Sequence, residues 1–210
     1  MKLSIQLKKL DACMEGYEWA KDKTIEVAWS TCGRGDWMLW YAAKLNIDRK
    51  LLIKAACSCA RIALRFVPEG EDRPRIAIET AEASAEGKAS IEDVKHAAYA
   101  ADAAAYAAAD AAADADADAD ADAAYAAADA AYAAVYVAYA AAYAAVYVAY
   151  AAADAADAAA YAADAAAYAA YAAADAADAA ADAAATLRVC AEIVRSIIPL
   201  DALITKGKQK

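Results

Sequence analysis

Between residues 125 and 182 most positions are alanine, and the tyrosines and aspartates recur among them in steps of three and four. The series starts at Tyr125, Asp129, Tyr132 and Tyr136 and continues with similar spacing to Asp182. Residues spaced in this way lie on one face of an α-helix, turn after turn. The pattern therefore predicts helix through the whole Ala-rich segment, residues 96–185.

Hydrophobic positions before this segment also recur at helical spacing, in shorter stretches separated by turn signals. Thr24 and Asp48 precede two of these stretches as capping residues, and Asp36 precedes a third. Pro74 falls in the first turn of a fourth, and Ser90 opens a capping box before the Ala-rich segment. We expect helices over 10–21, 25–32, 37–45, 49–67, 74–86 and 187–198, and a frayed basic tail over 206–210.

The predicted fold class is all-α, a helical bundle in three parts. Short helices occupy 1–95, an Ala-rich helical region packs with them over 96–199, and a C-terminal tail covers 200–210. A single rod of 90 residues would be about 135 Å long and would leave its alanine faces unpacked. We therefore expect a helical hairpin or bundle. The alternating aspartates from Asp114 to Asp122 are the best position for its turn, since like charges one turn apart repel.

The stripe of tyrosine and aspartate has two interpretations. It faces inward, with tyrosine rings in the core and hydroxyls on the carboxylates, or it faces solvent while the alanine faces pack together. The segment has no Lys or Arg to pair with its aspartates, and an unpaired buried carboxylate is costly. We favour partly buried tyrosines with aspartates at the wet edge. The alanine faces also offer a surface for a homo-oligomer.

Charge is distributed unevenly along the chain. The net charge is −10, but the Ala-rich segment holds 14 Asp and no base. The remainder, with 21 Lys and Arg against 17 acidic residues, carries about +4. An acidic body of this kind disfavours direct binding to nucleic-acid phosphates. It permits contact with a basic protein.

Two features predict the compartment. An aspartate at nearly every turn opposes membrane insertion of the Ala-rich segment, and residues 1–13 lack the apolar core of a secretory signal. Five cysteines, an odd number, favour reduced thiols. We expect a cytoplasmic protein with no membrane association.

The diverse side chains that could form a binding site lie in the first 95 residues. Trp37 and Trp40, with Arg34 and Asp36, follow a double-glycine turn. These residues are expected either to form part of the core with a helix cap or to anchor a protein partner. The second interpretation follows because Trp and Arg dominate binding hot spots.

A second candidate is the start of the helix expected at 74–86, where Arg73, Arg75 and Glu79 concentrate charge. Arg75 and Glu79 are one turn apart and can pair. The group favours a structural ion-pair network, with an anion site as the alternative.

The sequence carries no convincing metal, cofactor or catalytic motif. Asp118 to Asp129 has the spacing of a calcium loop, but Ala123 stands where that loop needs glycine. Cys57 and Cys59 point in different directions on a helix, so core thiols are expected. His96 has no nucleophile signature nearby. We predict a protein that is not an enzyme.

Two longer segments carry a family resemblance, and their most specific parts are Gly35-Asp36-Trp37, Cys59-Ala60-Arg61 and Asp72-Arg73-Pro74-Arg75. The segments are GRGDWMLWYAAKLNIDRKLLIKAACSCARIAL (33–64) and EGEDRPRIAIETAEASAEGKASIEDVKHAA (69–98). Together with the AYAADAAAYAA repeats, they resemble an alanine-rich family of bacterial and phage immunity proteins. The chain departs from the family at Ser84, where an aromatic is usual. The resemblance implies a cytoplasmic protein that neutralises a toxin by binding it.

The leading hypothesis is an interaction protein that binds and neutralises a toxin or a host factor. One alternative is an acidic mimic of nucleic acid, which needs outward, unpaired aspartates. Another is a helical protein that sequesters a small ligand in a tyrosine-lined cavity and so counters a defence system.

Overall fold

The computed structural model describes residues 3–67, 69–113 and 183–208. All regular secondary structure in these residues is helical, which confirms the all-α prediction. The expected hairpin, its turn at 114–122 and the stripe from Tyr125 to Asp182 lie outside the described residues. The helices are α1 (Leu3–Lys9), α2 (Met14–Ala20), α3 (Ile25–Thr31), α4 (Gly35–Lys44), α5 (Arg49–Ala60), the 3-10 helix η1 (Arg61–Phe66), α6 (Arg73–Ala85), α7 (Ile91–Ala113), α10 (Ala183–Ile197) and α11 (Leu200–Gly207).

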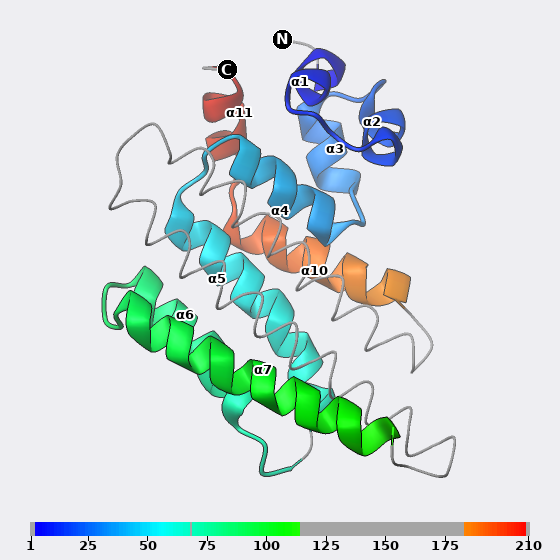
Figure 1. Ribbon diagram of the computed structural model, residues 1–210. Helices are drawn as coiled ribbons and strands as arrows, with labels where there is room; N and C mark the ends of the chain where they lie inside the picture. The colour runs from blue at the N-terminus through cyan, green and yellow to red at the C-terminus, as the bar shows by residue number, and fades with distance from the viewer. Residues whose placement is uncertain (1–2, 68, 114–182, 209–210) are drawn as a thin grey trace.

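Helices α4, α5 and α10 pack together in the middle of the fold (Figure 1). Helix α6 packs on α5, and α7 packs on α6. The short helices α1, α2 and α3 lie beyond α4, where α11 contacts α3. The C-terminal part of the chain therefore joins the N-terminal helices directly.

Small residues bring the central helices close together. A β-carbon added to Gly35, the first residue of α4, would lie 2.5 Å from Cβ of Cys190 and 2.9 Å from the backbone nitrogen of Ala191 in α10. Alanines fill much of the remaining interior, and a small side chain allows helix axes to approach. Those with at most 3 % exposure are Ala42 and Ala43 on α4, Ala55, Ala56 and Ala60 on α5, Ala77 and Ala81 on α6, Ala98 and Ala101 on α7, and Ala191 on α10.

Several predicted helix ends are confirmed. The Thr24 hydroxyl accepts a hydrogen bond from the backbone of Val27 at 3.3 Å, and Asp48 accepts one from Lys50 at 2.7 Å. The backbone N–H of Ser90 donates to the Asp93 carboxylate, and the backbone N–H of Asp93 donates to the Ser90 hydroxyl, as the capping box requires. Gly87 follows α6 with a φ of 76°, a conformation that favours glycine.

Other boundaries differ from the prediction. The helix expected over 10–21 is interrupted, because Asp11 adopts a left-handed φ of 57° and α2 begins only at Met14. The predicted cap at Asp36 is wrong: α4 begins at Gly35, and the carboxylate binds Arg34. Beyond α5, the predicted helix over 49–67 continues as η1.

The predicted C-terminal tail at 200–210 contains α11, which covers Leu200–Gly207. Leu203 is fully buried there, and the carbonyl of Gly207 accepts a hydrogen bond from Gln6 in α1. The expectation of a frayed segment from Lys206 is therefore wrong for Lys206 and Gly207.

Candidate binding pocket

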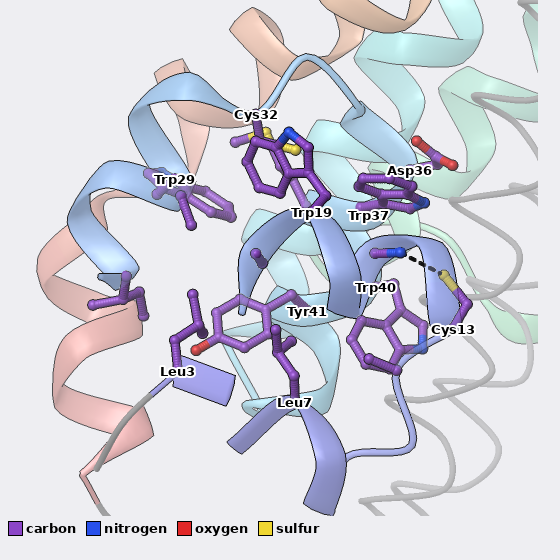
Figure 2. A pocket seen from close by; sticks show the side chains of 16 residues that line it. Leu3, Leu7, Cys13, Trp19, Trp29, Cys32, Asp36, Trp37, Trp40 and Tyr41 are labelled. Carbon is purple, nitrogen blue, oxygen red and sulfur yellow. Dashed lines mark hydrogen bonds between the residues drawn. The ribbon is translucent and has the colours of Figure 1, made fainter. Parts of the chain in front are cut away.

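All four tryptophans of the chain line one pocket between the first three helices and α4 (Figure 2). The pocket has a volume of about 190 Å³. It is partly open, because Cys13 at its edge is exposed and three of the tryptophans are only half-buried. The lining residues are Leu3, Leu7, Ala12, Cys13, Gly16, Trp19, Ala20, Ile25, Ala28, Trp29, Cys32, Asp36, Trp37, Met38, Trp40 and Tyr41.

The spacing along α4 explains how its side of the pocket forms. Trp37, Trp40 and Tyr41 are three and four residues apart, so they project from one helical face. Trp19 comes from α2 and Trp29 from α3, which places their rings opposite this face. The rings of Trp19 and Trp37 have centroids 6.1 Å apart and are tilted by 55°, a favourable aromatic geometry.

Tyr41 lies deep in the pocket wall and is 7 % exposed. Its hydroxyl donates a hydrogen bond to Oε1 of Gln6 at 2.8 Å, and Gln6 in turn donates to the carbonyl of Gly207. Burial raises the pKa of Tyr41 far above its usual range. The phenol is therefore neutral and already satisfied, so it is unsuited to proton transfer at neutral pH.

A bidentate ion pair holds one edge of the pocket. Nε and Nη2 of Arg34 donate to the Asp36 carboxylate at 2.9 and 2.6 Å, and Asp36 is only 3 % exposed. The Arg34 guanidinium also lies 4.5 Å from the ring centroid of Trp37. Charge-assisted bidentate bonds fix geometry strongly, so this pair orients the start of α4 and the ring of Trp37.

Two lysines stand over other rings of the pocket. The ammonium group of Lys23 is 4.1 Å from the ring centroid of Trp19, and that of Lys44 is 6.0 Å from the centroid of Trp40. Lys23 also donates a hydrogen bond to the carbonyl of Trp19. Cations at such positions are attracted to the ring faces. The pocket is thus apolar inside and charged around its edge.

The two cysteines at the pocket do not have the surroundings of a catalytic nucleophile. Cys13 accepts a hydrogen bond from the backbone of Gly16 at 3.4 Å and serves as the cap of α2. Burial raises the pKa of the Cys32 thiol, which donates to the carbonyl of Arg34. A thiol kept protonated by burial is a weak nucleophile.

The second predicted group lies apart from the pocket, at the start of α6, which packs on α5 and α7. Arg73 donates to Glu71 at 2.7 Å, and Arg75 binds Asp72 at 2.9 Å and Glu79 at 3.0 Å. The hydrogen bonds from Arg73 lower the pKa of Glu71. These pairs have the geometry of the structural ion-pair network that was the favoured interpretation.

The structure thus brings together Arg34, Asp36, Trp37 and Trp40, and it separates them from the charged group on α6. Trp19 and Trp29 also belong to the site, although they are not among the residues predicted from the sequence. Their signal was present, since all four tryptophans fall within residues 19–40. The sequence pattern does not show that α2 and α3 pack over α4, which is what brings Trp19 and Trp29 to the pocket.

The predictions about metal binding and membranes can be compared with the described residues only. No group of three or more His, Cys, Asp or Glu in the described ranges is arranged to hold a metal ion. The calcium-like spacing near Asp118 lies outside these ranges. No described helix is long and apolar enough to cross a membrane.

Comparisons with protein-family models, curated proteins and solved structures found no match for this chain.

Proposed function

We propose that this protein is a non-enzymatic interaction protein that binds and neutralises a protein partner, a toxin or a host factor, at the tryptophan pocket. The observation that carries the proposal is the convergence of all four tryptophans on one partly open hollow. Tryptophan and arginine dominate the binding energy of protein interfaces, usually from desolvated pockets near the interface centre.

The edge of the pocket supports this function. Arg34, Lys23 and Lys44 surround the apolar interior and keep long stems beside the rings. An apolar centre within a polar rim is the usual anatomy of a protein interface. The partner would place an apolar side chain in the pocket and polar groups on the rim.

The chemistry of the pocket favours a protein that neutralises its partner by binding it and not by catalysing a reaction. Tyr41 is a satisfied neutral phenol and Cys32 a buried thiol, so neither supports turnover. The resemblance to immunity proteins supports the same role, because such proteins act by binding. The five free cysteines favour a reducing compartment, in keeping with a cytoplasmic site of action.

The test begins with capture of partners by the purified full chain and identification of the captured protein. The identified partner is then purified, and its dissociation constant is measured with the wild type and with Trp37→Ala. Truncating a hot-spot residue costs about 2 kcal/mol or more, which corresponds to about thirtyfold weaker binding. The matched control is Tyr99→Ala, which removes an aromatic ring that is 60 % exposed on α7.

A second assay measures neutralisation. If the partner is a toxin, its expression alone should inhibit growth of the host cell, and co-expression of the wild-type chain should restore growth while Trp37→Ala does not. If the partner is a host factor, the wild-type chain should inhibit that factor's own activity while Trp37→Ala does not. Equal protection by a folded Trp37→Ala variant would reject the pocket. The double variant Arg73→Ala and Arg75→Ala addresses the α6 group. If that double variant loses more protection than Trp37→Ala, the partner binds at α6 and not at the pocket.

A further inference from the structure

The pocket is specific in its chemistry as well as its position. We infer that it accepts a neutral aromatic ring, presented as an exposed Phe or Trp side chain of the protein partner. The inference rests on the proposed function for the source of the ring. Its chemical part concerns only the pocket, and free probes can test that part.

Size supports a single ring system. The pocket volume is about 190 Å³, and an engineered protein cavity of about 150 Å³ binds benzene. A phenyl ring therefore fits, and so does a slightly larger indole. The small side chains of Ala12, Gly16 and Ala28 leave this space open among the larger ones.

Charge excludes the ionic alternatives. A cation would seek the faces of Trp19, Trp37 and Trp40, but Lys23, Arg34 and Lys44 already stand over those rings. A carboxylate in the pocket would lose part of its hydration and gain little from Arg34, because Nε and Nη2 of that guanidinium are already bound to Asp36 at 2.9 and 2.6 Å.

The hydrogen bonds already made in the pocket disfavour an uncharged polar ligand. Tyr41 donates its hydroxyl proton to Gln6, and the Cys32 thiol donates to the Arg34 carbonyl. Among the described residues no buried side-chain nitrogen or oxygen is without a hydrogen-bond partner. Apart from the indole N–H groups of the half-buried tryptophans, the lining offers few groups to replace the water bound to a polar ligand, so its entry carries a net cost.

The rings of the wall favour an aromatic ligand over an aliphatic one of the same size. Trp19 and Trp37 already meet at 55°, and a further ring can meet their edges and faces in the same manner. Aromatic pairs gain about 0.5–1.5 kcal/mol beyond their buried area, equivalent to about a two- to tenfold difference in affinity.

The experiment titrates the full chain with capped amino acids and follows the four indole N–H signals by NMR. N-acetyl-phenylalanine amide is compared with N-acetyl-cyclohexylalanine amide, which has the same shape class but no aromatic electrons. The charged probes are the corresponding amides of lysine and glutamate. We expect saturable shifts with phenylalanine, binding about two- to tenfold weaker with cyclohexylalanine, and none with the charged probes.

Two variants separate loss of the pocket from loss of the fold. Ala28→Leu fills space in the lining and should prevent binding of the phenylalanine probe while the chain stays folded. Tyr99→Ala should bind the probe as the wild type does. Cyclohexylalanine binding as tightly as phenylalanine, or tighter binding of a charged probe, would overturn the inference. So would unchanged binding to a folded Ala28→Leu.

The outcomes also separate this inference from the proposed function. If the phenylalanine probe binds but the purified partner binds Trp37→Ala normally, the pocket chemistry holds and the proposed function fails. If the partner needs the pocket but aliphatic probes bind best, the proposed function holds and the aromatic anchor is wrong. Competition between the phenylalanine probe and the partner would support both.

Discussion

Substituting Gly35 by alanine tests the contact that holds α4, and with it the pocket, against α10. The new β-carbon would lie 2.5 Å from Cβ of Cys190 and 2.8 Å from its carbonyl carbon. Non-bonded carbons prefer about 3.5–4.0 Å. The obstacle includes backbone atoms, so a rotamer change in Cys190 cannot remove it. The two helices would have to separate by about 1 Å.

The expected cost follows from two opposing effects. Overpacking in a tight core costs about 1–3 kcal/mol, whereas replacing glycine by alanine inside a helix gains up to about 1 kcal/mol. Gly35 is the first residue of α4, where that gain is smallest. We expect Gly35→Ala to lower the free energy of unfolding by about 1–2 kcal/mol.

Urea unfolding followed by tryptophan fluorescence measures this change, because all four tryptophans lie beside α4. Gly16→Ala is the matched control: the atoms nearest its new β-carbon are the Cys13 sulfur at 3.2 Å and two Trp37 ring carbons at 3.7 and 3.8 Å. The Cys13 side chain can move, so this change should stay below about 1 kcal/mol. A Gly35→Ala variant as stable as the wild type would refute the close approach of α4 and α10.

Three further predictions follow from other contacts. Arg195→Ala should lower the free energy of unfolding by about 2–3 kcal/mol in urea titrations, because its guanidinium bonds two carbonyls at the end of α3 at 3.0 and 2.8 Å. Native protein should react with a thiol reagent rapidly at Cys13 alone, the only exposed cysteine, since burial raises the pKa of Cys57 and limits access. Hydrogen bonds from Ser90 lower the pKa of Asp93, so their stabilisation is present above the unfolded aspartate pKa and is lost as pH falls through the folded one. Ser90→Ala should reduce this acid dependence in unfolding curves measured across pH, because it removes the hydroxyl bond and keeps the backbone N–H bond to Asp93.

The parts of the fold that the sequence predicts are those decided by neighbouring residues. Thr24 and Asp48 cap helices because the side chain reaches backbone donors two or three residues away. Helical spacing likewise identifies the common face of Trp37 and Trp40. Such features depend on local chemistry and do not require the tertiary arrangement.

The pocket itself depends on contacts between distant segments. The approach of Gly35 to Cys190 and the bonds from Arg195 to the end of α3 join residues about 155 or more positions apart. The error at Asp36 has a local cause. Its position before an apolar run resembles a cap, but the helix starts one residue earlier and Arg34 binds the carboxylate.

The most direct test of the account is the dissociation constant of the identified, purified partner for Trp37→Ala relative to the wild type. Both chains should first show equal helicity under the conditions of the binding measurement, well below the urea midpoint of either chain. If the partner binds at the tryptophan pocket, Trp37→Ala should bind it at least about thirtyfold more weakly, and Tyr99→Ala should bind it as the wild type does. Equal affinity of the wild type and Trp37→Ala would contradict the claim that the partner binds at the tryptophan pocket.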